Sequence, residues 1–179
     1  MAMFKKPIRI YGKHALIMQK YCKDKGGDQE VKFSISDNEG FVDDHFYVFE
    51  TRIGLYMIAA MLGIIYQKQA EEDVNKKIYS SIMSDMVEKQ RSNLERIYHH
   101  MVLSDSSIDS ADLKIKKAFS IIPTEEECDK EEAKLESYVR GGLEIVDNAL
   151  SNCKTYEDIC NAIIDLISML HVSDLVADE

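Results

Sequence analysis

The stretch from Phe46 to Tyr66, FYVFETRIGLYMIAAMLGIIY, limits most strongly what this chain can fold into. It holds only two charged residues, Glu50 and Arg52, and from Ile53 onward its apolar residues fall on every side of a helical projection. A helix with this pattern is surrounded by protein rather than lying on a surface. We therefore predict one core helix over residues 46–66.

Small residues are spaced through this predicted core helix. Gly54, Ala59 and Gly63 carry no bulky side chain, and each glycine costs a helix about 1 kcal/mol of propensity relative to alanine. Such positions let neighbouring backbones come close, so we expect them at helix contacts. We also expect Ile58 and Leu62 to be nearly inaccessible to solvent.

Length and composition favour a single helical domain. The charge-free part of the core stretch covers 14 residues, 53–66, and a membrane span needs roughly 20. A chain of 179 residues with 45% apolar and 30% charged residues has the composition of one globular domain. Two prolines and eight glycines leave few turns for a β-rich fold. We predict one all-α domain over 1–179, a bundle of about five to six helices.

Two further helices are predicted around the core stretch. Pro7 suits a first helical turn, and a rough apolar stripe continues until Gly26 and its glycine neighbour end it. After the core helix, apolar residues recur at steps of three or four from Val74 to Val102, with Gln90 as an interruption. This pattern predicts one amphipathic helix of 29 residues, roughly 44 Å long.

The C-terminal half predicts three more helices. Residues 111–119 form a short apolar and lysine pattern, and the serine- and aspartate-rich segment 104–110 before them suits a flexible connection. Thr124 and Glu127 have the spacing of a capping box, which starts a helix that runs to about residue 150. Thr155 and Asp158 repeat that spacing before a final apolar stripe over 159–170.

The segment 31–48 favours a short hairpin or an extended loop. The order V-K-F-S-I over 31–35 alternates as in a half-buried strand, and turn residues follow at 38–40. A partner strand could lie at 41–42 or at 46–48. The residues Asp43, Asp44 and His45 suit either a helix N-cap cluster or a metal or acid–base pair.

The cysteines and histidines are not spaced as the ligands of a metal site are. No CxxC pair occurs among the four cysteines, Cys22, Cys128, Cys153 and Cys160. His99 and His100 are adjacent, so on a helix they point about 100° apart and cannot share one metal. We expect reduced thiols, no metal and no cofactor. The N-terminus has no apolar run after its basic residues, which predicts no signal peptide and a cytoplasmic location.

One alternative is a ribonuclease. Some small helical bundles of bacterial defence and toxin systems cleave RNA with an arginine, four to six further residues and then a histidine, because phosphate needs a cation and the proton needs an imidazole. Here seven residues separate Arg91 from His99, and two separate Arg96 from His99. The candidate catalytic residues in this alternative are Arg91, Arg96, His99 and His100.

The net charge and the positions of the basic residues bear on whether the chain binds nucleic acid. A net charge of −10 disfavours unassisted binding to nucleic acid. Basic residues gather near the N-terminus, where they predict either a solvated helix face or a weak, sequence-independent DNA-binding patch: Lys5, Lys6, Arg9, Lys13, Lys20, Lys23 and Lys25.

Gly141 and Gly142 stand inside a helical pattern, beside Arg140. Two glycines in mid-helix lower helix propensity by about 2 kcal/mol relative to alanine. We expect a close approach there, by a helix of this domain or by a second copy. No strand precedes the pair and no Lys-Ser/Thr follows it, so the pair is not a nucleotide-binding loop.

Two runs, FETRIGLYMIAAMLGIIYQKQ and LESYVRGGLEIVDNAL, resemble a family of small helical proteins associated with bacterial DNA phosphorothioation (Dnd) systems. That family carries a "vFAAalGf" helix and a later "eYanGGle" helix. The likeness covers about a third of the chain, and the mainly acidic turn at 67–73 departs from the family's basic turn.

The resemblance implies an accessory protein of a DNA-modification or antiphage defence system, with no assigned catalytic residue. We expect a non-enzymatic adaptor whose partners are proteins of the same operon, with a homodimer as a further option. Membrane and direct nucleic-acid contacts are not expected. The packing or interface residues of this hypothesis are Gly54, Ala59, Gly63, Arg140, Gly141 and Gly142.

Overall fold

The computed structural model describes residues 3–23, 33–37, 40–43, 46–119 and 124–172, with side chains up to Ser168. This part of the chain is mainly helical, as predicted, but it holds seven helices rather than five or six. The helices are α1 (Gly12–Tyr21), α2 (Arg52–Ile65), α3 (Ser84–Lys89), α4 (Arg91–Leu103), α5 (Ala111–Phe119), α6 (Glu125–Leu150) and α7 (Tyr156–Val172). Two antiparallel strand pairs accompany them: β1 (Ile8–Tyr11) with β4 (Tyr79–Ile82), and β2 (Ile35–Ser36) with β3 (Val42–Asp43).

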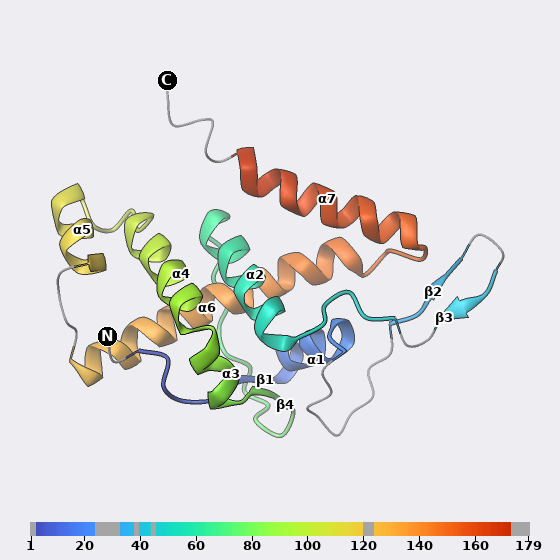
Figure 1. Ribbon diagram of the computed structural model, residues 1–179, viewed down its shortest axis with the longest axis horizontal. Coiled ribbons are helices and arrows are strands. Elements are labelled where there is room, and N and C mark those ends of the chain that lie inside the picture. Colours follow the sequence, from blue (N-terminus) through green and yellow to red (C-terminus); the bar gives the residue numbers. More distant parts are fainter. Residues whose placement is uncertain (1–2, 24–32, 38–39, 44–45, 120–123, 173–179) are drawn as a thin grey trace.

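The centre of the fold is the pair formed by α2 and α6 (Figure 1). A Cβ atom at Gly142 would overlap the backbone carbonyl of Ala59, and one at Gly63 would overlap that of Tyr138. Gly141 lies equally close to the Lys68 carbonyl, just after α2. The close approach expected at the paired glycines is therefore present, and it is made within this chain.

The predicted core helix is shorter than expected and is not buried all round. Residues 46–50 are not helical. The helix α2 begins after Thr51, whose side chain accepts a hydrogen bond from the Gly54 N–H at 3.2 Å. Leu62 is fully buried, as predicted. The prediction for Ile58 is wrong, because its side chain is 39% exposed. The apolar pattern of α2 predicts burial on all sides, but one face of the helix lies at the surface.

The predicted first helix begins with a strand instead. Ile8 and Ile10 are buried while Arg9 between them is exposed, which is the alternation of a half-buried strand. Gly12 then takes a left-handed φ of 59°, and the Lys13 N–H at the start of α1 donates to the Asp73 side chain at 2.9 Å. This acceptor lies far along the chain, so the local pattern could not reveal the break. The predicted end at Gly26 lies outside the described residues.

The prediction of one helix over 74–102 is also wrong. Val74 is almost fully exposed, the segment 79–82 pairs with β1, and two helices follow with Gln90 between them. Ser80 and Ile82 are buried at alternate positions. In β4 the backbone N–H and C=O groups are hydrogen-bonded to β1 instead of within a helix. This long-range pairing therefore decides the structure of the segment, although its apolar residues have a helical spacing.

The three helices predicted in the C-terminal half are confirmed. The short helix has the predicted bounds, and Thr124 and Glu127 form a complete capping box at the start of α6. The Thr155 hydroxyl accepts from the Asp158 N–H at 3.1 Å just before α7. Between α4 and α5, Asp105 is 9% exposed and pairs with Lys134 on α6.

A short hairpin is present, because β2 pairs with β3. Its strands share one residue each with the predicted segments 31–35 and 41–42, and residues 31 and 32 lie outside the described residues. Asp43 lies in β3, whereas Asp44 and His45 lie outside the described residues. All four cysteines lie in the described part of the chain, where no disulfide joins them, and three of them are buried. No helix within the described ranges is long and apolar enough to cross a membrane.

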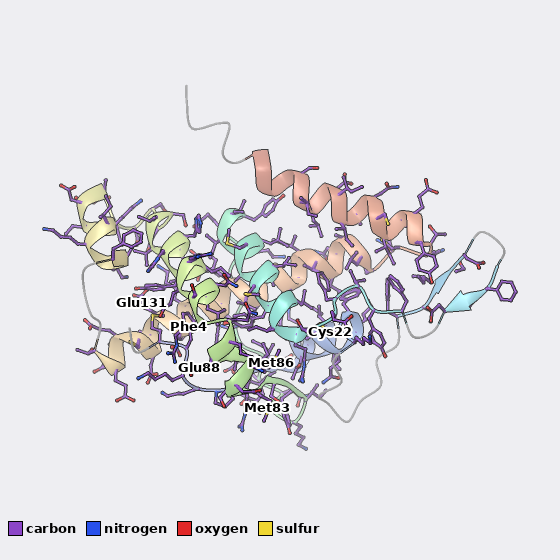
Figure 2. All side chains as sticks on the ribbon, in the orientation of Figure 1. Phe4, Cys22, Met83, Met86, Glu88 and Glu131 are labelled. Atoms are coloured by element: carbon purple, nitrogen blue, oxygen red, sulfur yellow. The ribbon has the colours of Figure 1, made fainter. Side chains whose placement is uncertain are left out.

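The N-terminal segment packs into the fold. Phe4 is 3% exposed, and Figure 2 shows it between α3 and the N-terminal half of α6. Its backbone N–H donates to the Glu132 carboxylate at 2.7 Å. This segment is therefore part of the domain core rather than a solvated basic arm.

Candidate functional site

The four candidate ribonuclease residues lie on α4 but do not form one site. Arg91 pairs with Glu88 at 3.1 Å, about 12 Å along the helix axis from His99. The His99 ring packs against Phe119 of α5 with centroids 4.5 Å apart. Burial lowers the pKa of His99 below its ordinary value. Its imidazole is thus occupied by packing rather than presented to a phosphate.

The other two candidates are exposed on α4. Arg96 and His100 both lie at the helix surface. Among the described residues, no hydrogen bond or ion pair joins either candidate arginine to either histidine. The arrangement lacks the cation and imidazole held together that RNA cleavage needs.

The N-terminal basic residues are largely neutralised by acids. Lys6 pairs with Asp129 at 2.9 Å, and Lys23 pairs with Glu50 at 3.2 Å. Two lysines of α1 pair with carboxylates of α6, as described below. The result is a surface of mixed charge rather than a basic face, and Lys25 lies outside the described residues.

A groove of about 480 Å³ runs between α1 and α6 and is lined mainly by polar residues. Lys13 pairs with Glu144 at 2.7 Å, and Lys20 pairs with Asp147 at 3.1 Å across it. Lys68 also reaches Glu144, at 3.1 Å. The remaining lining residues are Leu16, Ile17 and Asn148.

Behind this groove lies His14, which has no exposed surface. Its Nε2 lies 3.3 Å from a Glu144 oxygen, and burial lowers the pKa of the imidazole. Burial alone would raise the pKa of Glu144, but hydrogen bonds from Lys13, Lys68 and His14 outweigh it and lower that pKa to about 2. Glu144 is therefore ionised and already occupied.

Asp147 is held in the same way. It accepts a hydrogen bond from the Tyr21 hydroxyl at 2.8 Å and one from Lys20. Burial and the neighbouring carboxylate raise the pKa of Tyr21 above its usual range, so the phenol stays protonated. A substrate in the groove could not touch His14, and both carboxylates are paired. The cluster fastens α1 to α6, and it offers no free acid or base.

The six predicted packing residues have different roles in the structure. Four of them lie at the contact of α2 and its following turn with α6: Ala59, Gly63, Gly141 and Gly142. Arg140 is nearly buried, and its Nε–H donates to the Ala70 carbonyl at 2.8 Å. A Cβ at Gly54 would meet only the Thr51 hydroxyl, so Gly54 makes no close helix contact.

Sequence reasoning missed the cluster around Glu144. The spacing of the charged residues could have indicated it, because Lys13 and Lys20 are seven apart on α1 and Glu144 and Asp147 are three apart on α6. Each pair lies on one helix face. What the sequence did not show was that these two faces meet.

Large apolar side chains are exposed on four of the described helices, α2, α4, α5 and α7. On α2, Ile58 is exposed while Met57 and Met61 beside it are half-buried. These three residues lie on one face, which we call the outer face of α2. On α5, Ile115 and Phe119 are more than half exposed, as is Ile164 on α7.

Within the described ranges, no group of three His, Cys, Asp or Glu side chains is placed to hold a metal ion. No protein-family model, curated protein or solved structure matches the chain. The similarity of two of its helices to Dnd-associated proteins therefore stands on sequence pattern alone.

Proposed function

We propose that this protein is a non-enzymatic accessory protein of a bacterial DNA-modification or antiphage defence system, and that it acts in the cytoplasm through contacts with other proteins. The observation that carries the proposal is the outer face of α2, defined by Met57, Ile58 and Met61. It belongs to a helix in which Arg52, at the first position, is the one charged residue. Covering apolar surface gains about 25 cal/mol per Å². An apolar face of this kind favours association with another chain.

The polar side chains support the same proposal. Residues with catalytic potential are engaged within the fold: His14 with Glu144, and His99 with Phe119. Paired lysines near the N-terminus argue against direct DNA binding. The two runs that resemble Dnd-associated proteins form α2 and α6, so that resemblance supports a shared helix pair and brings no catalytic residue with it.

Net charge supports a particular kind of partner. A chain of net charge −10 is attracted to a basic protein and repelled by nucleic acid. We expect a larger, more basic protein of the same operon to bind the acidic surface.

The test is an affinity pull-down of the tagged full-length protein from its own cell, with RNA cleavage assayed on the same preparation. The expected result is retention of a basic protein of the same operon in stoichiometric amount and no cleavage. Metal-free RNA cleavage that is lost in Arg96→Ala and His99→Ala would replace this proposal with the ribonuclease alternative. Retention of no protein would also count against the adaptor.

A further inference from the structure

The helix α7 carries two apolar stripes that lie side by side. The inner stripe packs into the core, with Ile159 and Leu166 only 3% and 9% exposed. The second stripe is exposed along its length. We call this second set the outer stripe of α7, and its members are Tyr156, Cys160, Ile164 and Ile167.

The outer stripe has the spacing of a helix face that meets another helix. Its members stand four, four and three residues apart, so they share one face over about three turns. Tyr156 is 43% exposed, Ile164 58% and Ile167 48%. A face of this kind fits the apolar side of an amphipathic helix, whose contact residues recur at the same steps.

The polar flank of the outer stripe is acidic. Glu157 and Asp165 are exposed, and each follows a member of the stripe, about 100° further round the helix than that member. No lysine or arginine occurs from Tyr156 to the end of the chain. Lys154, just before the helix, is the one lysine or arginine after Arg140.

The neighbouring hairpin adds to this negative charge. Figure 1 shows β2 and β3 beside the start of α7, where the Ser36 N–H donates to the Lys154 carbonyl at 2.7 Å. The Phe46 and Tyr156 rings also meet edge-on there, with centroids 5.1 Å apart. Residues 33–51 and 155–179 contain eleven of the 32 acidic residues and none of the 22 lysines and arginines. The net charge of the chain therefore comes from these two segments, and the remainder is close to neutral.

This charge decides which kind of molecule fits the outer stripe. Nucleic acids and anionic lipid headgroups are negative, so the acidic flank repels them. A second copy with its own outer stripe facing this one would place like charges together, which disfavours that contact. A basic helix gains apolar burial and also ion pairs along the flank, as in paired helices with charged edges.

We propose that the outer stripe of α7 binds a basic amphipathic helix of a partner protein. In the complex, apolar residues of the partner helix cover Ile164 and Ile167, while its lysines or arginines pair with Glu157 and Asp165. The proposal rests on the proposed function, because it takes up the basic partner expected there and assigns to it a contact on a helix other than α2.

The first test measures, by fluorescence anisotropy, the binding of two synthetic amphipathic peptides to the purified full-length protein. Both peptides have leucines at helical spacing, and their polar positions hold lysine in one and glutamate in the other. The wild type should bind the lysine peptide and not the glutamate peptide. Ile164→Ser/Ile167→Ser should weaken binding of the lysine peptide about tenfold or more, because the apolar contact is lost. Leu113→Ser is the matched control, since Leu113 is 57% exposed on α5, and it should bind like the wild type.

A charge reversal on the flank sharpens this test. Glu157→Lys/Asp165→Lys should weaken binding of the lysine peptide and create binding of the glutamate peptide, a gain that loss of folding cannot imitate. Asp109→Lys/Asp112→Lys changes the net charge by the same amount at exposed positions before and at the start of α5. This control should not gain binding of the glutamate peptide. Far-UV circular dichroism of every variant checks that the fold is kept.

The second test uses Cys160, which is exposed within the outer stripe while the other three cysteines are buried. Its alkylation by iodoacetamide is followed by mass spectrometry in the isolated protein and in the complex retained by the pull-down. The complex should protect Cys160. A cysteine introduced on α5 by Leu113→Cys should react equally in both samples.

Three results would overturn the outer stripe as a binding surface. They are a wild type that does not bind the lysine peptide, binding that Ile164→Ser/Ile167→Ser leaves unchanged, and a Cys160 that reacts equally in the complex and in the isolated protein. If Ile58→Glu releases the retained partner while Cys160 stays reactive in the wild-type complex, this inference is wrong and the proposed function stands. Retention of no protein counts against the proposed function, and the peptide measurements then decide the outer stripe alone.

Discussion

The central helix pair and the two outer helices differ in how they use their apolar residues. In α2 and α6, Leu62, Val139 and Leu143 have no exposed surface, and glycines bring the backbones into contact. In α5 only Ala118 is buried, while Ile115 and Phe119 are more than half exposed. The comparison teaches that the fold depends on the inner pair, whereas the outer helices leave apolar surface exposed.

The largest loss of stability is expected from replacing Gly142, because the contact between α2 and α6 leaves no room for a side chain there. A leucine there would drive its Cβ into the Ala59 carbonyl, which belongs to the backbone and cannot move aside. Gly142→Leu should prevent folding, seen as loss of the cooperative urea transition. Gly40→Ala separates overlap from backbone strain, because a Cβ there meets nothing within 4 Å while the φ of 86° favours glycine. It should lower stability but keep a cooperative transition. A cooperative, unshifted transition in Gly142→Leu would contradict the packing described here.

Truncation of two residues on α2 compares the inner and outer sides of one helix. Leu62→Ala should lower the free energy of unfolding by about 2–5 kcal/mol through lost burial and a cavity. Ile58→Ala should lower it by less than about 1 kcal/mol, since its side chain is 39% exposed. Urea unfolding of the purified protein measures both. Equal losses would show that α2 is buried all round.

A third prediction concerns the carboxylate that fastens α1 to α6. The pKa of Glu144 is lowered to about 2, so its contribution of about 3 kcal/mol is present above pH 4.5 and is lost as the pH falls toward 2. Glu144→Gln should be less stable than the wild type at pH 7, and the difference should shrink below pH 4. A constant difference between pH 7 and pH 3 would refute the assignment.

Glu136, eight positions earlier on α6, should show the opposite sign. Burial raises its pKa to about 7, so the folded state keeps a proton that the unfolded state releases above pH 4.5. Stability should therefore fall as the pH rises from about 4.5 to 7. Glu136→Gln should flatten that fall in urea unfolding curves measured across this range.

The smallest effect is expected at the N-terminus of α6. Thr124→Ala removes the side-chain acceptor for the Glu127 N–H and should cost about 1 kcal/mol. Thr124→Ser keeps the acceptor and is the control. A loss in the serine variant equal to that in the alanine variant would show that capping is not the cause.

How much of this could be predicted from the sequence depended on the range of the interactions. The capping boxes and the bounds of α5 are local, and the sequence predicted them. The break at Gly12 depends on Asp73, and β4 depends on pairing with β1. Both contacts join residues far apart in the chain. The helical spacing of apolar residues therefore predicts longer helices than the chain forms.

The same limit applied to the candidate site. Gly141 and Gly142 could be predicted at a close contact, because glycine in mid-helix is costly without one. The polar cluster between α1 and α6 could not be predicted, since it depends on how two distant helices face each other. The exposure of Ile58 could not be predicted either, because the sequence does not distinguish an apolar residue in the core from one on an exposed apolar face.

The most direct test of the division between inner and outer helices is amide hydrogen exchange of the full-length protein. The amides of α2 and α6 should exchange only through global unfolding, as those of buried core helices do. The amides of α5 and α7 should exchange faster. Protection in α5 and α7 equal to that of the inner pair would contradict the account.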